Sequence, residues 1–368
     1  MHSSFQIGKV MGIPIRLHIT FLAIIPWVAY VYGSVSEPLF GKIYGFGAIE
    51  PAFDKWAYSL AFAVLLFVCV ALHELGHSFV ARKYGITIKS ITLYLFGGVS
   101  AMEEIPRDPR IELQMAAAGP GVSGVIGVAC VVLYYWSDAL FGAAHPLTIL
   151  LWTLGVVNII LMAFNLLPAF PMDGGRVIRA WFATKMPYVQ ATSRAASIGR
   201  MFAIIMGILG VFSLNFLLLL IAFFVYIGAS EEEKATAISI SLEGVKVRDI
   251  MSSDVHTVTP DLSLKDLTDR MFHEKHRGYP VMENDKIVGV VTVTDVQKIP
   301  EPKRASTPVG EVMSKEIYAI GPDEDASTAM KKMNELGIRR LPVIRDSSMV
   351  GILSREDLVR AIEFSSQR

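Results

Sequence analysis

The stretch Ala57–Val80, AYSLAFAVLLFVCVALHELGHSFV, joins an apolar run to three ionisable side chains near its end. Tyr58 to Val70 carries no charge, and the motif His73-Glu-Leu-Gly-His77 follows at once. On a helix, HExxH places two imidazoles one turn apart on one face, which is the spacing of a zinc site. The glutamate beside them is placed to act as a base on water. Ionisable groups cost several kcal/mol in lipid unless they face a polar or metal-filled interior. The stretch therefore predicts water chemistry performed within a membrane.

The composition of the chain changes at about residue 230. Of its 368 residues, 52% are hydrophobic and 18% charged, with a mean hydropathy of +0.46, which is high for a soluble protein. The apolar residues are concentrated before Glu231. The formal net charge is zero, so the global balance does not indicate a nucleic-acid partner. Cys69 and Cys130 fall in apolar runs and are expected to be small core residues, without a disulfide.

Six apolar stretches approach the roughly 20 residues needed to cross a bilayer. They are Leu17–Tyr32, Ala57–Ala81, Leu113–Trp136, Leu147–Leu167, Ile198–Phe212 and Leu214–Ile227. The last two are short and meet around Ser213-Leu214-Asn215, so we expect a tight helical hairpin rather than one longer helix. The first stretch lacks a small-residue cleavage pattern and is expected to span the membrane rather than to be a signal peptide. The predicted fold is a polytopic α-helical membrane protein with about six spanning helices, followed by a soluble α/β half.

Basic residues predict the orientation of these helices, because they favour the cytoplasmic side. They gather before the first stretch, between the second and third, between the fourth and fifth, and after the sixth: Lys9, Arg16, Arg82, Lys83, Lys89, Arg107, Arg110, Arg176, Arg179, Lys185, Arg194 and Lys234. Both termini are therefore expected on the cytoplasmic side of the cell membrane. Counted from Arg82 at 1.5 Å per residue, His77 and His73 would lie about 8 to 14 Å below that surface.

The segment Ile88–Met102, between the second and third stretches, is rich in β-branched and aromatic residues and contains Phe96-Gly97-Gly98. It predicts a strand or hairpin close to the membrane. A loop with a glycine turn is the simpler alternative. As an exposed strand edge, the segment could pair with an extended peptide.

A catalytic zinc ion usually takes three protein ligands and leaves a fourth position for water. The best third ligand is Asp173, in the run NLLPAFPMDGGR that begins at Asn165. Pro168 and Pro171 must break the helix there, and broken helices at membrane depth are tolerated where they line a cavity. Asn165 is expected to hydrogen-bond the substrate backbone or the developing oxyanion. Alternatively, Asp173 is only a turn residue. His18 is expected to be an interfacial histidine outside the metal site.

These residues resemble the site-2 protease family of intramembrane zinc metalloproteases. The resemblance covers about residues 1–230 and rests on the order of HELGH and NLLPAFPMDGGR in two spanning helices. It also includes GIPIRLH from Gly12, Phe96-Gly97-Gly98, and Ala118-Gly119-Pro120.

The resemblance to this family implies a role for each residue of the motifs. His73, His77 and Asp173 would bind one catalytic Zn²⁺ ion, with Glu74 as the catalytic base. The β segment would hold the substrate in extended form. Family substrates are transmembrane segments, often of membrane-tethered transcription regulators or anti-sigma factors.

The soluble half contains an internal repeat with an offset of 62 residues. Three elements recur: VRDIM from Val247 as VGEVM from Val309, YPV from Tyr279 as LPV from Leu341, and GVVTVTD from Gly289 as GILSRED from Gly351. A repeat of this length, with a helix after its proline, two strands and a closing helix, resembles a tandem cystathionine-β-synthase (CBS) domain pair. The expected boundaries are 1–230 for the membrane domain, 231–243 for a linker, and 244–300 and 301–368 for the two CBS domains.

The CBS resemblance implies an adenine nucleotide, ATP, ADP or AMP, bound at the pair. Thr292 or Ser354 would contact phosphate, since a hydroxyl at a helix N-terminus meets an anion, and Asp295 or Asp357 would accept from the ribose hydroxyls. Alternatively, Thr292 and Ser354 only cap the last helix of each repeat, which is compatible with binding. CBS pairs commonly dimerise, so a homodimer is expected.

The leading hypothesis is a membrane-embedded zinc endopeptidase that cleaves peptide bonds within or near transmembrane segments and responds to adenine nucleotide. The alternative is a CBS-gated metal-ion transporter, with His73, Glu74, His77 and Asp173 forming the ion path. An ion path normally needs polar groups spread across the bilayer, whereas these four residues cluster near one face. The sequence therefore favours the protease.

Overall fold

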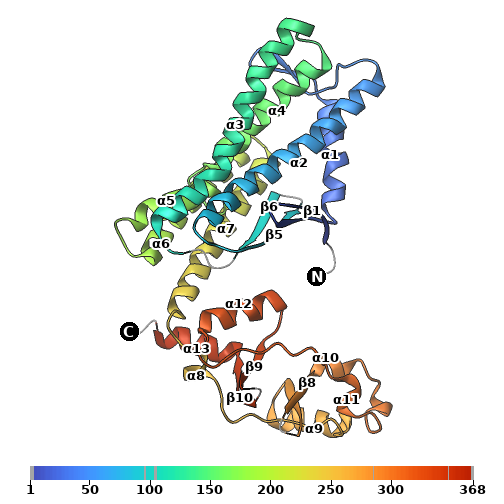
Figure 1. Ribbon diagram of the computed structural model, residues 1–368, viewed down its shortest axis with the longest axis vertical. Coiled ribbons are helices and arrows are strands. Elements are labelled where there is room, and N and C mark those ends of the chain that lie inside the picture. Colours follow the sequence, from blue (N-terminus) through green and yellow to red (C-terminus); the bar gives the residue numbers. More distant parts are fainter. Residues whose placement is uncertain (1–3, 95–96, 103–105, 285, 347, 366–368) are drawn as a thin grey trace. The chain divides into compact units, whose positions relative to one another are not determined.

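The computed structural model describes residues 4–94, 97–102, 106–284, 286–346 and 348–365, which form two compact units, Met1–Lys234 and Ala235–Arg368 (Figure 1). The boundary between the units falls inside helix α7 (Phe216–Ser241). The segment 231–243, expected to be a linker, is therefore helical up to Ser241.

The first unit is a bundle of apolar helices. Among the described residues, four helices are long and apolar enough to cross a membrane: α2 (Ala52–Lys83), α3 (Pro109–Phe141), α4 (Pro146–Asn165) and α6 (Tyr188–Phe212). Helix α1 (Phe21–Ser34) has 14 residues, and α7 has 26 residues that include the last apolar stretch. The helical membrane fold is confirmed, while the count of six spans stays a prediction.

Several helix boundaries differ from the predicted stretches, among them the starts of α1 and α6. The first helix starts at Phe21 instead of Leu17, because residues up to His18 belong to a strand. Helix α6 starts at Tyr188, ten residues before the predicted Ile198. The first half of α6 buries small residues such as Ala191 and Ala195. Hydropathy alone does not mark this half as part of a spanning segment.

The expected helical hairpin between α6 and α7 is confirmed. The chain reverses at Ser213–Asn215, where Leu214 has a left-handed φ of 52°. The side chain of Asn215 accepts a hydrogen bond from the backbone N–H of Leu218 at 3.0 Å, which satisfies a free amide at the start of α7.

Helix α3 packs between α2 and α4. A Cβ on Gly76 of α2 would lie 3.0 Å from the carbonyl oxygen of Ala118 on α3, so a glycine is needed for this close approach. Cys69 and Cys130 are both buried in one cluster with residues of α1, α2 and α4. The prediction that both cysteines are core residues is confirmed.

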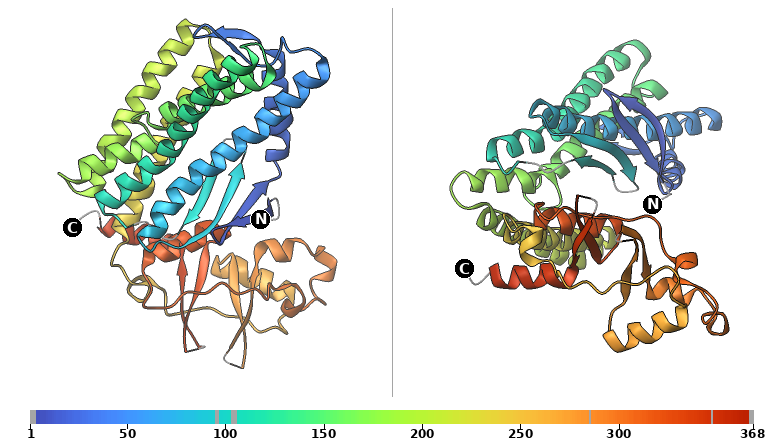
Figure 2. Two further views of the ribbon diagram at one scale, coloured as in Figure 1. Left: turned by 45° about the horizontal axis from the view of Figure 1, so that its top comes forward. Right: turned by 60° about the horizontal axis from the view of Figure 1, so that its bottom comes forward.

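A four-stranded sheet lies beside α2, as Figure 2 shows. Its order is β1 (Ser4–Val10), β2 (Ile13–His18), β5 (Ile88–Tyr94) and β6 (Gly97–Met102). The antiparallel pairing of β5 with β6 confirms the strand prediction for residues 88–94 and 97–102, while Phe96 of the quoted motif lies outside the described residues. The sequence did not indicate that β2 pairs in parallel with β5, since this contact joins residues more than 70 positions apart. A small hairpin, β3 (Glu37–Leu39) and β4 (Lys42–Tyr44), follows α1.

The predicted break after the fourth apolar stretch is confirmed. Helix α4 ends at Asn165, and the short amphipathic helix α5 (Asp173–Ala183) begins after Pro168 and Pro171. Because proline cannot donate the helical hydrogen bond, the chain turns between them. Asp173 is thereby the first residue of a new helix.

The second unit contains the two predicted repeats. The first has α8 (Val247–Ile250), α9 (Leu264–Glu274), β7 (Gly278–Glu283), β8 (Lys286–Thr292) and α10 (Val293–Gln297). A 3₁₀ turn (Glu301–Lys303) leads to the second, which has α11 (Val309–Val312), α12 (Ala326–Leu336), β9 (Arg340–Arg345), β10 (Ser348–Ser354) and α13 (Arg355–Ser365). Val247 of α8 is buried in the core of the second repeat and Val309 of α11 in the core of the first. This exchange ties the two repeats into one α/β unit.

Candidate metal centre

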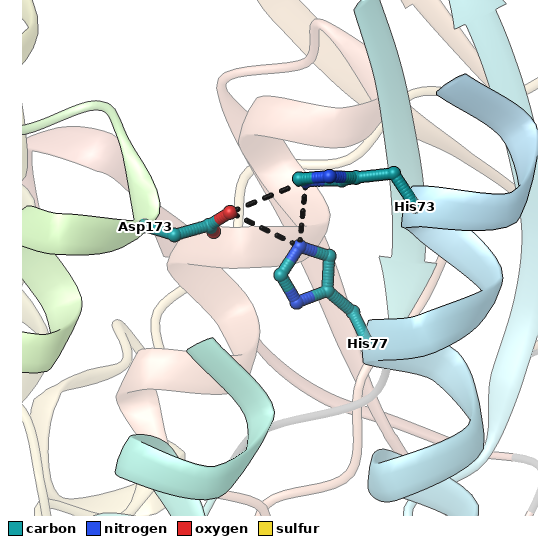
Figure 3. Close-up of side chains that lie close together, drawn as sticks. All are labelled: His73, His77 and Asp173. Carbon is teal, nitrogen blue, oxygen red and sulfur yellow. Dashed lines mark hydrogen bonds and ion pairs between the residues drawn. The ribbon is translucent and has the colours of Figure 1, made fainter. Parts of the chain in front are cut away.

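The side chains of His73, His77 and Asp173 converge on one point between α2 and α5 (Figure 3). The two Nε2 atoms lie 3.2 Å apart, and the Oδ2 atom of Asp173 lies 3.3 Å from His73 Nε2 and 3.2 Å from His77 Nε2. A tetrahedral zinc ion, about 2.0 to 2.1 Å from each ligand atom, places those atoms about 3.3 Å apart. The triangle therefore has the size that zinc requires. Alternatives such as a simple turn role for Asp173 do not account for this convergence.

Residues of helix α3 contact the Nδ1 atoms of both histidines. His73 Nδ1 lies 2.9 Å from the hydroxyl of Ser123, and His77 Nδ1 lies 2.7 Å from the carbonyl oxygen of Met115. A carbonyl oxygen can only accept, so His77 Nδ1 carries the proton and Nε2 presents its lone pair to the centre. Such outer contacts fix the tautomer and the ring plane of metal-binding histidines.

Gly119 of α3 leaves the space that the metal centre occupies. A Cβ at this position would overlap the Nε2 atoms of both His73 and His77. Gly98 of β6 makes room for Glu74 in the same way. The Glu74 side chain is half-buried, and a Cβ on Gly98 would overlap it. The Ala118-Gly119-Pro120 and Gly97-Gly98 motifs thus supply the room around the centre.

A cavity of about 890 Å³ contains the centre. Its apolar walls come from α1, α2 and α4 and include Ile24, Phe67, Val70, Val157 and Leu161. Its polar lining residues are His73, Glu74, His77, Glu112, Asn165, Asp173, Arg176, Arg179 and Tyr188. The sequence-predicted Asn165 thus lies at the cavity, where its side-chain Nδ2 donates to the Leu161 carbonyl at 2.9 Å. His18, expected outside the site, lies in β2 and contacts Thr20.

A buried ion cluster, which was not predicted from the sequence, lies at the polar end of this cavity. Arg179 of α5 donates to Glu112 of α3 at 2.7 Å and to Glu232 of α7 at 2.6 Å. Its guanidinium lies 4.9 Å from the ring centre of Phe170 and 5.0 Å from that of Tyr188. Arg179 therefore joins α3, α5 and α7, and it belongs to the helix that begins with Asp173.

The four residues predicted to bind nucleotide form two equivalent pairs. The hydroxyl of Thr292 donates to Asp295 Oδ2 at 2.7 Å, and that of Ser354 to Asp357 Oδ2 at 2.6 Å. Each aspartate also accepts the backbone N–H of the hydroxyl residue. These contacts are the capping interaction considered as the simpler alternative, and they hold each carboxylate at the N-terminus of a helix.

The sequence model of peptidase family M50 matches residues 61–142 and 138–206. A zinc metalloprotease of Methanocaldococcus jannaschii is 37% identical over 362 residues, which are 98% of this chain and 97% of that protein. The chain belongs to peptidase family M50. This family comprises the site-2 proteases, so the chain is a membrane zinc metalloprotease of the site-2 type. The transporter alternative is therefore set aside.

The second unit of this M50 protease is a tandem CBS pair. The CBS domain model matches residues 247–301 and 309–364. A CBS domain-containing protein of Bacillus subtilis, YhcV, is 31% identical over 114 residues, 30% of this chain and 81% of that protein. Among solved structures, a site-2 protease from M. jannaschii shares 40% identity, with a TM-score of 0.44, and the match covers 62% of this chain and 95% of that chain.

Proposed function

We propose that this M50 protease hydrolyses peptide bonds within or near transmembrane segments of membrane proteins, as in regulated intramembrane proteolysis. The observation that carries the proposal is the triangle of His73, His77 and Asp173 inside a cavity with apolar walls. Such a cavity suits an apolar substrate segment, while its polar end supplies the hydrolytic groups. We further propose, from the basic residues, that this end faces the cytoplasm.

The three ligand residues fit one zinc ion by chemistry and by distance. Bound there, zinc would polarise the peptide carbonyl and make a water molecule more acidic. Glu74, the neighbour of His73, takes the proton from the attacking water and delivers it to the leaving nitrogen. Asn165 hydrogen-bonds the substrate backbone or the developing oxyanion, which requires its Nδ2 to turn from the Leu161 carbonyl.

The sheet supports an extended binding mode for the substrate. Strand β6 stands at one end of the sheet order, and its Gly98 approaches the side chain of Glu74. A peptide added to the side of β6 away from β5 would run past the catalytic glutamate, held by main-chain hydrogen bonds. A transmembrane helix must unwind to bind in this way, so substrates whose helices carry glycine or proline near the cytoplasmic end are favoured.

The decisive experiment compares wild-type protein with Glu74→Gln, both purified in detergent and incubated with membrane-spanning test substrates. We expect the variant to bind zinc normally and to cleave at least about 100-fold more slowly, since a general base contributes about 10² to 10⁴-fold. Glu37→Gln, in the β3–β4 hairpin, is the matched control and should cleave normally. Equal cleavage by the Glu74 variant would refute the proposal.

We also propose that an adenine nucleotide binds the CBS pair and regulates the protease. Support comes from the paired Thr292–Asp295 and Ser354–Asp357 contacts, which present hydroxyls and carboxylates at helix N-termini. Helix α7 offers a route for the signal, because it continues from the membrane unit into the CBS unit. Through Glu232 it binds Arg179, on the helix that begins with Asp173. A shift of α7 on nucleotide binding would then move the third zinc ligand.

The test adds ATP, ADP or AMP to wild type, to Asp295→Asn with Asp357→Asn, and to Glu232→Gln. We expect nucleotide to change the cleavage rate of wild type, the aspartate variant to lose nucleotide binding, and Glu232→Gln to bind nucleotide without the rate change. Glu231→Gln, at an exposed site paired with Lys234, is the control. Failure of all three nucleotides to bind wild type would refute regulation and leave the protease assignment intact. We expect a homodimer through the CBS domains, which light scattering in detergent checks.

A further inference from the structure

A second group of metal-ligating side chains lies in the first CBS repeat, outside the membrane unit. His256 precedes α9, Glu274 ends that helix, and His276 follows it before β7. Glu274 Oε2 lies 2.8 Å from His256 Nδ1 and 3.8 Å from His276 Nδ1. The ligand atoms of all three lie within 4.8 Å of one another, and the imidazole rings stand nearly perpendicular at 83°.

We propose that His256, Glu274 and His276 form a binding site for a divalent transition-metal ion of the zinc class. Two imidazoles and one carboxylate suit zinc, copper or nickel, whereas magnesium and calcium require mainly oxygen ligands. The distances of 2.8 and 3.8 Å bracket the separation of about 3.3 Å that tetrahedral zinc imposes. Small rotations of half-exposed side chains therefore complete the site.

The carboxylate of this site is already oriented by its neighbours. Arg270 Nε donates to Glu274 Oε1 at 2.7 Å, and the hydroxyl of the buried Tyr279 donates to Oε2 at 2.9 Å. These contacts turn Oε2 towards both histidines, as outer contacts do around metal ligands. The guanidinium of Arg270 also places a positive charge close to the ion. The site therefore binds metal more weakly than the membrane centre does.

The repeat shows that the CBS fold does not require these three residues. At the 62-residue offset, the second repeat carries Tyr318, Leu336 and Ile338 in place of His256, Glu274 and His276. Both repeats nevertheless form the same helix–strand–strand–helix unit. The three ligand residues thus occur in the first repeat and not at the equivalent positions of the second, whose residues supply substitutions that suit the fold.

The experiment counts zinc ions on the full-length protein. Protein in detergent is stripped of metal with a chelator and reloaded with zinc sulfate alone. Unbound zinc is then removed by desalting, and the bound zinc is measured by elemental mass spectrometry. Wild type should retain two zinc ions per chain, and the variant His256→Tyr with His276→Ile should retain one. His73→Ala, which removes the membrane ligand, should also retain one. His273→Ala, one position before Glu274 and outside the cluster, should retain two.

An equal zinc content of wild type and the His256→Tyr/His276→Ile variant would overturn the proposal, whereas loss of zinc only from the membrane site would leave these two proteins one ion apart. A second measurement guards against misfolding of that variant. Added zinc should raise the unfolding temperature of the wild-type CBS unit, because a ligand that binds only the folded state stabilises it. His256→Tyr alone should abolish this rise, measured against the metal-free unfolding temperature of the same variant. A rise that persists in His256→Tyr would equally refute the site.

Discussion

Among the residues that the structure describes, two groups consist of two imidazoles and one carboxylate, and they differ in burial and in geometry. In the membrane unit, the side chains of His73, His77 and Asp173 are 6%, 12% and 15% exposed, and their ligand atoms form an almost equilateral triangle. In the CBS unit, His256, Glu274 and His276 are 41%, 24% and 36% exposed, and their triangle is irregular. The same ligand types therefore stand in two different environments.

The difference teaches that ligand type decides which ion can bind, whereas the surroundings decide what the ion can do. The membrane triangle is backed by Ser123 and Met115 and lies in a cavity where charges interact strongly. The carboxylate of the CBS group is shared with Arg270 and Tyr279. We propose that only the first arrangement serves catalysis, and substitutions at and around each group test this contrast.

The largest effect is expected from Asp173→Asn. An amide is a poor zinc ligand and also brings an N–H group towards two imidazole lone pairs. Substituting a residue that hydrogen-bonds to a metal ligand typically costs about 10- to 100-fold. We expect the loss of a ligand itself to reduce proteolysis by more than that, with loss of one zinc ion per chain. Cleavage and zinc content are measured together. Asp54→Asn, near the start of α2, is the control, and an Asp173 variant that keeps its zinc would contradict the geometry.

Gly119→Ala should act nearly as strongly without touching a ligand. The added Cβ would overlap the Nε2 atoms of both histidines, so the rings must leave the positions that suit zinc. We expect at least a 10-fold loss of zinc affinity at the membrane site. This is the lower end of the range found when hydrogen bonds to metal ligands are disturbed. Gly121→Ala is a matched control on the same helix, since its Cβ would have no described heavy atom within 4 Å. Equal affinities of the two variants would show that α3 does not shape the site.

Ser123→Ala should have a smaller effect. It removes the hydroxyl that contacts His73 Nδ1 at 2.9 Å, and such supporting contacts are worth about 10- to 100-fold in metal affinity. Zinc titration against a competing chelator measures the loss. Ser78→Ala is the control, because the Ser78 hydroxyl is buried on α2 without a hydrogen-bond partner in the described part of the chain. An unchanged zinc affinity in Ser123→Ala would show that the Ser123 hydroxyl does not support the membrane triangle.

The smallest effect concerns the CBS group in metal-free protein. The hydrogen bond from Arg270, with that from Tyr279, lowers the pKa of Glu274 to about 2 from the ordinary 4.5. A carboxylate whose folded pKa is depressed stabilises the fold above its unfolded pKa, and this contribution is lost as the pH falls through the folded value. Between pH 4.5 and 2, the unfolding temperature of the CBS unit should therefore fall more steeply for wild type than for Glu274→Gln. Glu283→Gln is the exposed control, and parallel curves for Glu274→Gln would contradict the ionic network.

The sequence predicted that His73, His77 and Asp173 would lie together because two local signals indicated it. HExxH fixes the positions of His73 and His77 by helical periodicity, and the two prolines place Asp173 just beyond a helix end. The structure brings these three residues together, as expected, and places Glu74 and Asn165 at the same cavity. The CBS fold followed from its repeat, since matched motifs at a constant offset predict equal units.

The contacts that support the site could not be predicted in this way. Ser123, Gly119 and Arg179 act through helices that meet across the bundle, and their roles depend on which face of α3 or α5 turns inward. The long apolar stretch of α3 carries no periodic signal for that choice, and the amphipathic pattern of α5 does not indicate which distant helices supply the partners of Arg179. The parallel pairing of β2 with β5 was hidden for a related reason, because no local pattern names a distant partner.

The sequence by itself determined the membrane and soluble halves, the repeat and the types of ligand, since periodicity, hydropathy and motif spacing are properties of neighbouring residues. Only the tertiary structure decided the 3.2 to 3.3 Å triangle at the membrane centre and the room left by Gly119. It alone also brought His256 and His276, to which the sequence assigned no role, onto the two sides of Glu274. Distances between side chains on separate segments depend on how whole elements pack, and a one-dimensional pattern does not contain them.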